Sequence, residues 1–205
     1  MKIFILFFIV TFFTMTISSQ GQKDNKSPSS KKSELPYHQI PDYPDEFTAN
    51  NVAARMIDGL GYRYYWVTKD LREEDLAYRI SEDSRTTRET VVHIYGLSRT
   101  IMCAPQSKVN SSSKEDLNFD ELRKRTLENL LLASQLLKEG KKGDMNGYKM
   151  IFQRGDKTTE YPFWNVINGP IADAIYHTGQ IVAYRRASGN PIQRGVRVLT
   201  GKTKE

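Results

Sequence analysis

Histidines are the residues of this chain that are best suited to metal chemistry. The 205-residue sequence holds three, His38, His93 and His177. Asp173 precedes His177 by four residues. On a helix, side chains at this spacing project from one face about one turn apart, which suits two ligands of one ion. The same pair is also common on solvated helix faces, so the spacing alone leaves both interpretations open.

His93 and His177 share a position relative to the apolar residues around them. A helical wheel places each histidine at the border of the apolar stripe of its own segment. In a helical bundle, side chains at such borders on adjacent helices can converge on one site. The structural alternative for each histidine is a half-buried imidazole that donates a hydrogen bond to a backbone carbonyl. His38 lies in a different stretch of the chain.

Three further polar residues flank these histidines. Gln180 and Tyr184 fall on the same wheel edge as His177, and Glu89 precedes His93 by one helical turn. A group beside a metal ligand can orient it through a hydrogen bond, and a carboxylate can act as a general base. Glu89, Gln180 and Tyr184 are therefore candidate catalytic residues, each with a purely structural role as the alternative.

Four segments carry apolar residues at the 3.6-residue spacing of a helix. They predict helices over about residues 48–71, 87–102, 118–139 and 162–187, the last with a kink at Gly169-Pro170. The patterns Thr86-x-x-Glu89 and Asn118-x-x-Glu121 predict capping boxes at two of the starts. Residues 105–116 read as a polar loop, and residues 141–160 as a loop with one short apolar island that forms a strand or a turn. Four helices without alternating strand patterns predict an all-α bundle.

The first residues have the composition of an export signal. Lys2 is followed by an apolar run from Ile3 to Ile17 and then by small polar residues. This layout is typical of a secretory signal peptide, and the run is short for a membrane span, although a retained membrane anchor is the alternative. We therefore expect a signal peptide over residues 1–21, a flexible arm over residues 22–45 and one domain over residues 46–205. The later part of the arm, residues 35–44, carries enough apolar and aromatic surface to lie against this domain. The mature protein is expected to be periplasmic or extracellular, with no integral membrane span after cleavage.

The charge pattern bears on the possible partners of the chain, and the cysteine content bears on what stabilises its fold. Formal net charge is +6, from 30 Lys and Arg against 24 Asp and Glu. Charges of both signs are interleaved, and no basic cluster is combined with aromatic residues in the manner of a nucleic-acid-binding surface, so no nucleic-acid partner is expected. The single cysteine, Cys103, cannot form an internal disulfide, so core packing must stabilise the fold.

Two segments of the chain resemble the DinB-like superfamily. Residues 90–97, Thr-Val-Val-His-Ile-Tyr-Gly-Leu, are similar to the family's second helix around its first metal-binding histidine. Residues 163–186, with the core His-Thr-Gly-Gln-Ile and the following Ser-Gly-Asn-Pro, are similar to its last helix. The resemblance extends over about residues 47–191. It implies an up-and-down four-helix bundle that holds a divalent metal, usually through three histidines.

The family's ligand set carries over to this chain with one substitution. His93 and His177 match two of the family's histidines, and Asp173 occupies the place of the third. Two imidazoles and one carboxylate are compatible with zinc and also with nickel, iron or manganese. We therefore expect a divalent-metal site formed by His93, Asp173 and His177.

The expected function follows from the coordination positions that three protein ligands leave open. Such a site can activate water or bind substrate, so a metal-dependent enzyme that acts on a small molecule is the leading hypothesis, either a hydrolase or a catalyst of thiol transfer. The alternative is a non-catalytic helical bundle of the cell envelope that binds a metal or a small molecule. The sequence leaves open whether the chain is a monomer or a homodimer.

Overall fold

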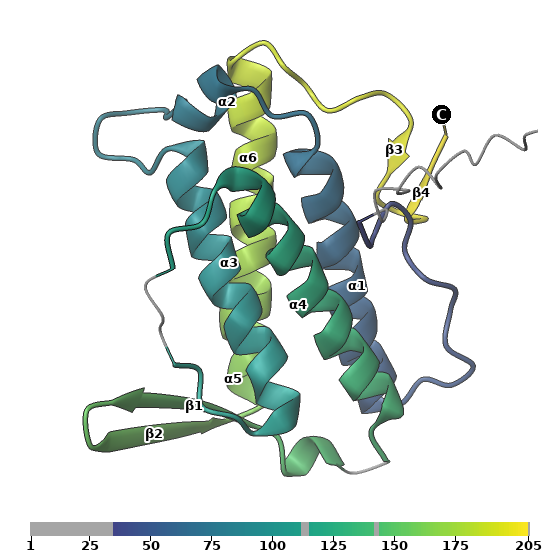
Figure 1. Cartoon of the computed structure of the whole chain (residues 1–205). Helices are drawn as coiled ribbons and strands as arrows, with labels where there is room; N and C mark the ends of the chain where they lie inside the picture. The colour runs from purple at the N-terminus through teal and green to yellow at the C-terminus, as the bar shows by residue number, and fades with distance from the viewer. Residues whose placement is uncertain (1–34, 112–114, 142–143, 205) are drawn as a thin grey trace, which may run out of the picture. The chain divides into compact units, whose positions relative to one another are not determined.

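The computed structural model describes residues 35–111, 115–141 and 144–204, and the chain over these ranges is mostly helical (Figure 1). The expected signal peptide and the first part of the arm lie outside the described residues. Four long helices dominate: α1 (Ala49–Thr68), α3 (Thr87–Cys103), α4 (Phe119–Glu139) and α6 (Ala172–Ala187). Their bounds agree with the predicted segments to within a few residues, except that the last segment is divided.

Side-chain caps explain where two of these helices begin. Thr86 accepts a hydrogen bond from the backbone N–H of Glu89, whose carboxylate accepts one from the backbone N–H of Thr86. Asn118 and Glu121 form the same reciprocal pair before α4. Each pair satisfies backbone donors that the first turn of a helix leaves without partners. Both predicted capping boxes are confirmed.

The long helices enclose one apolar core. Helix α1 packs on α4 and α6, and α3 packs on the same two helices. Fully buried side chains from all four helices meet between them, among them Ile57, Leu60, Ile94, Ile101, Leu127, Leu130, Leu137 and Ile181. Among the described residues, no helix combines the length and the hydrophobicity needed to cross a membrane.

The directions of the helices differ from the predicted up-and-down order. Asn50 at the start of α1 donates to the carbonyl of Leu137 at the end of α4, and Arg123 at the start of α4 donates to Thr68 at the end of α1. Helices α1 and α4 are therefore antiparallel, whereas α3 and α4 begin at the same end of the molecule and run in parallel (Figure 1). The prediction that each helix runs opposite to the one before it is therefore wrong for α3 and α4. The chain between them, residues 104–118, is long enough to span the length of a helix, because an extended chain covers about 3.3 Å per residue and a helix only about 1.5 Å.

Short elements occupy both ends of the helical layer. Helix α2 (Glu73–Ala77) follows α1, and two antiparallel hairpins pair β1 (Lys149–Arg154) with β2 (Lys157–Pro162) and β3 (Val196–Arg197) with β4 (Lys202–Thr203). In the first hairpin Lys149 stands opposite Pro162. The apolar island near residue 150 is thus a strand, whereas α2 and the second hairpin were not predicted.

The segment before α1 is packed against that helix. The Tyr37 hydroxyl donates to the buried carboxylate of Asp58 at 3.0 Å, and the indole of Trp66 donates to the carbonyl of His38 at 3.1 Å. The Tyr37 ring lies so close to Gly61 that a Cβ there would stand 2.4 Å from it, which explains a glycine inside α1. Residues 37 and 38, in the later part of the expected arm, are therefore held against α1 by aromatic burial and these hydrogen bonds.

Cys103, the last residue of α3, is partly buried, and burial raises the pKa of its thiol. Because a raised pKa lowers the thiolate fraction at neutral pH, we expect alkylation by iodoacetamide to be slower than that of free cysteine. Cys103→Ala should change the free energy of unfolding by less than about 1 kcal/mol, since the thiol packs as a small apolar group. Urea denaturation and mass spectrometry after timed alkylation measure both effects. Alkylation faster than that of free cysteine would contradict the expectation.

Candidate metal site

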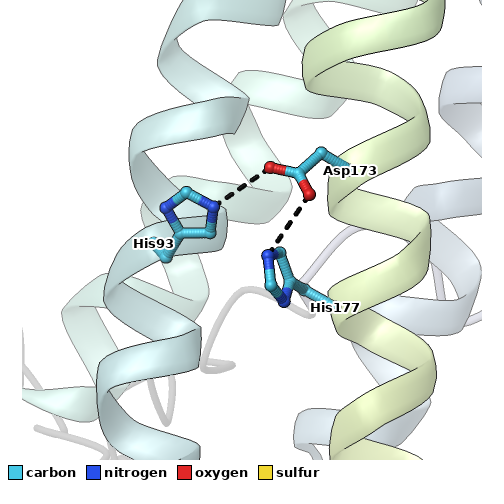
Figure 2. A group of neighbouring side chains, drawn as sticks. All are labelled: His93, Asp173 and His177. Atoms are coloured by element: carbon cyan, nitrogen blue, oxygen red, sulfur yellow. Dashed lines mark hydrogen bonds and ion pairs between the residues drawn. The ribbon is translucent and has the colours of Figure 1, made fainter. Parts of the chain in front are cut away.

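The predicted ligands come together from two adjacent helices. His93 lies in α3, while Asp173 and His177 lie on consecutive turns of α6, and all three side chains point toward one another (Figure 2). His93 Nε2 is 3.1 Å from one carboxylate oxygen of Asp173, and His177 Nε2 is 3.3 Å from the other. The two imidazole rings are 4.7 Å apart between centroids and nearly perpendicular. The expected meeting of these three residues is therefore observed.

An irregular turn positions the α6 ligands. The predicted kink is a π-helical turn, Ile167–Ile171, between a short α5 (Trp164–Val166) and α6, and it contains the buried Pro170. Proline has no backbone N–H and cannot donate within a helix, so a wider turn accommodates it. Asp173 follows within the first turn of α6, with Ala174 and Ile171 buried on the core side. The π-helical turn thus sets the rotation at which α6 presents Asp173 and His177 to α3.

The three ligands differ in their exposure to solvent. The side chain of His177 is 10% exposed, whereas those of His93 and Asp173 are 32% and 41% exposed. One side of the triad therefore rests on the core and the other is accessible to water. An ion held here would keep open coordination positions, as catalytic sites do and closed structural sites do not.

Gln180 fixes the orientation of His177. Its side-chain oxygen lies 2.6 Å from His177 Nδ1, one turn along α6. When Nδ1–H donates to this oxygen, the neutral ring carries its lone pair on Nε2, the atom that faces Asp173. Two acceptors then face each other at 3.3 Å, an arrangement that a cation between them would stabilise. Histidines that bind metals commonly donate their other N–H in this way.

Replacement of Gln180 tests this assignment. Gln180→Met removes the acceptor, so we expect the affinity for Zn²⁺ to fall by about 10- to 100-fold, the usual effect of losing a partner of a metal-bound histidine. Gln180→Glu keeps an acceptor and should retain or tighten binding. Calorimetric titration of both variants measures the change. If Gln180→Glu binds as weakly as Gln180→Met, Gln180 is a donor to His177 and the proton assignment is wrong.

The other two candidate catalytic residues have structural partners. The carboxylate of Glu89 accepts from the backbone N–H and hydroxyl of Thr86, and these hydrogen bonds lower its pKa. It therefore caps α3, and a carboxylate with a lowered pKa is a weak base near neutral pH. Tyr184 is buried, and its ring packs against Tyr78 at 5.6 Å. Neither placement supports a role at the triad.

Tyr176 was not a candidate in the sequence, yet it contacts the site. Its ring centroid lies 5.3 Å from that of His177, in an edge-to-face arrangement, and the residue is 64% exposed. An exposed aromatic ring therefore lies directly beside the imidazole of His177. The sequence shows that Tyr176 is the neighbour of His177. This did not predict the contact between their rings, because consecutive residues of a helix lie on different faces.

Arg185, near the end of α6, has structural partners. The Arg185 guanidinium is buried and donates to the carbonyls of Trp66, Val67 and Lys69, which end α1, and to Asn190. A cation at the C-terminus of a helix satisfies the free carbonyls and is favoured by the helix dipole. Arg185 is therefore a structural residue and not part of an anion-binding surface.

The residue set fits a divalent ion by both donor type and distance. Among the described residues, His93, Asp173 and His177 form a possible metal-binding group whose ligand atoms all lie within 4.8 Å of one another. Two atoms bound to one ion at about 2.0–2.2 Å can be separated by up to about 4.4 Å. Small side-chain rotations would therefore suffice for all three to share an ion.

Comparison of the whole chain with protein-family models, with curated proteins and with solved structures finds no match. The DinB-like resemblance therefore rests on the two helix segments described above. The function of this chain must therefore be inferred from the geometry of the triad.

Proposed function

We propose that this chain is an exported, divalent-metal-dependent enzyme of the DinB-like type that acts on a small molecule, as a hydrolase or in thiol transfer. The observation that carries the proposal is the meeting of His93 with Asp173 and His177. His93 is 80 or more positions from Asp173 and His177 in sequence, yet the carboxylate of Asp173 lies within hydrogen-bonding distance of both imidazoles. A water-accessible side on such a triad favours catalysis over a closed structural site.

The arrangement of the helices supports assignment to this fold type. We infer a four-helix bundle in which α3 and α6 are neighbours, the pair that carries the two DinB-like segments. A bundle with one long crossover connection is a known variant of the architecture, so the parallel α3 and α4 are compatible with it. The expected metal ligands project from facing helices, as is usual for metal sites in bundles.

Each residue has a defined role in the proposed site. His93, Asp173 and His177 would hold the ion, Gln180 would keep His177 in the tautomer that offers Nε2, and Tyr176 would flank the substrate. When bound, a divalent ion such as Zn²⁺, Ni²⁺, Fe²⁺ or Mn²⁺ supplies a Lewis acid and lowers the pKa of a water molecule. Export is proposed from the composition of residues 1–17 alone.

Metal analysis of untagged protein tests the metal site. Wild type purified without added metal, then offered each of the four ions, should retain about one equivalent of at least one of them after gel filtration. His93→Ala should lose it. His38→Ala is the matched control, because it removes an imidazole that packs instead on Tyr65 and Trp66. Wild type without metal, or equal retention in His93→Ala and His38→Ala, would refute the site.

Turnover assays then separate the enzyme from the non-catalytic alternative. Metal-loaded wild type is assayed on ester, amide and phosphoester substrates, and on electrophiles with a low-molecular-weight thiol. The proposal expects turnover in one class that is lost in His93→Ala and kept in His38→Ala. If metal binds but no class is turned over, a metal-binding helical protein of the cell envelope replaces the enzyme.

A further inference from the structure

A pocket lies apart from the triad, at the N-terminal end of α1. A pocket of about 400 Å³ opens between the first two turns of α1 and the junction of β2 with α5. Val52 and Met56 form one wall, Phe163 and Trp164 another, and Met145 a third. None of the residues that line it belongs to the candidate metal site.

The pocket walls are mainly apolar. Asn146 is the one polar residue among the described residues that line it, and no charged residue is among them. Trp164 is 76% exposed, Val52 46% and Met56 37%, so apolar side chains face water at the rim. A ligand that covers them would remove this surface from water, at about 25 cal/mol per Å² of apolar area. The side chains of Met56 and Met145 are flexible, so this part of the pocket lining can adapt to ligands of different shape.

The volume and the absence of charge define the class of ligand. A protein cavity of about 150 Å³ is large enough for benzene, so a pocket of this size has room for roughly 16 non-hydrogen atoms. A charged group would lose its hydration without gaining a partner of opposite charge. We infer that this pocket binds an uncharged, mainly hydrocarbon small molecule of up to two or three rings. This inference does not depend on the metal site.

Two fluorescent probes test the predicted chemistry. N-phenyl-1-naphthylamine is uncharged and becomes brighter in apolar surroundings, and anilinonaphthalene sulfonate carries the same rings with an added sulfonate. Folded protein should bind the neutral probe at one site and bind the anionic probe at least tenfold more weakly. No saturable binding of the neutral probe, or equal affinity for the two probes, would overturn the inference.

Substitutions at matched positions locate the site. Val52→Asp introduces a charge into the pocket wall and should weaken binding of the neutral probe by tenfold or more. Val92→Asp is the control, because Val92 is 49% exposed on α3, close to the 46% of Val52, and does not line the pocket. Ala49→Phe, which fills the pocket from an exposed position, should weaken binding similarly. Circular dichroism verifies folding of each variant. Equal binding by Val52→Asp, Ala49→Phe and Val92→Asp would overturn the assignment.

Discussion

Replacing Asp75 with asparagine should lower the free energy of unfolding by about 3 kcal/mol or more at pH 7, because it removes the charge from a buried, fully hydrogen-bonded carboxylate. Asp75 in α2 is 1% exposed and accepts hydrogen bonds from Arg72, Ser188 and Asn190. These contacts join α2 to the chain that follows α6. Urea denaturation of wild type and variant measures the loss.

The pH dependence of this loss has a defined sign. Hydrogen bonds from Arg72, and then from Ser188 and Asn190, hold the pKa of Asp75 well below its usual range. A lowered pKa in the folded state contributes stability that is complete above the pKa of the unfolded chain, about 3.9, and is lost as the pH falls toward the folded value. The difference between wild type and Asp75→Asn should therefore be full at pH 7 and should narrow below about pH 4.

Glu74 provides the control for this experiment. It forms an ion pair with the same Arg72, but its side chain is 66% exposed. Exposed pairs contribute about 0–1 kcal/mol, so Glu74→Gln should have little effect. Equal losses in the two variants, or a difference that does not change with pH, would show that Asp75 does not act through its buried charge.

His177→Ala should abolish metal binding while the protein stays folded. Removal of a ligand should lower affinity by more than the roughly 10- to 100-fold that follows loss of a hydrogen-bonding partner. The helices pack around an apolar core, so their stability should not depend on the ion. Metal stoichiometry and circular dichroism report the two properties separately.

Asp173→His tests the same site with a substitution that is expected to preserve metal binding. Imidazole is a ligand for the same late divalent ions, so this variant should retain or tighten binding. A full equivalent of metal in His177→Ala would disprove the ligand set. Loss of metal in Asp173→His would show that the carboxylate is required and that the likeness to a three-histidine site is misleading.

Local patterns in the sequence predicted the long helices well. The 3.6-residue spacing of buried residues such as Ile94 and Ile101 identified α3, and Leu130 and Leu137 did so for α4. These signals depend only on which face of a helix is buried. The same reasoning placed His93 and His177 at the edges of their stripes. The choice of His93, Asp173 and His177 as one ligand set depended in addition on the four-residue spacing of Asp173 and His177 and on the DinB-like resemblance.

Other features depend on contacts between distant segments and have no local signal. Helices α3 and α4 run in parallel (Figure 1), and the composition of a polar loop does not show whether the next helix starts at the same end of the molecule or at the opposite end. Glu89 was considered both as a cap and as a base, and spacing could not decide between them. The sequence does not distinguish whether Arg185 pairs with an acidic side chain or binds an anion, and in the structure its partners include carbonyls more than a hundred residues away.

The first and last described segments of the domain meet beside α1. The backbone N–H of Ile40 donates to the carbonyl of Gly201 at 2.9 Å, and the hydroxyls of Tyr62 and Thr203 are 2.8 Å apart. Domains whose ends lie close together commonly tolerate circular permutation. A short linker between residues 204 and 35, with new termini at the exposed turn between β1 and β2, should therefore give a rearranged chain in which the connection from α3 to α4 is unchanged. In such a permutant the chain would begin and end in the hairpin of β1 and β2. Helix α1 would keep its contacts with both segments that are terminal in the natural order.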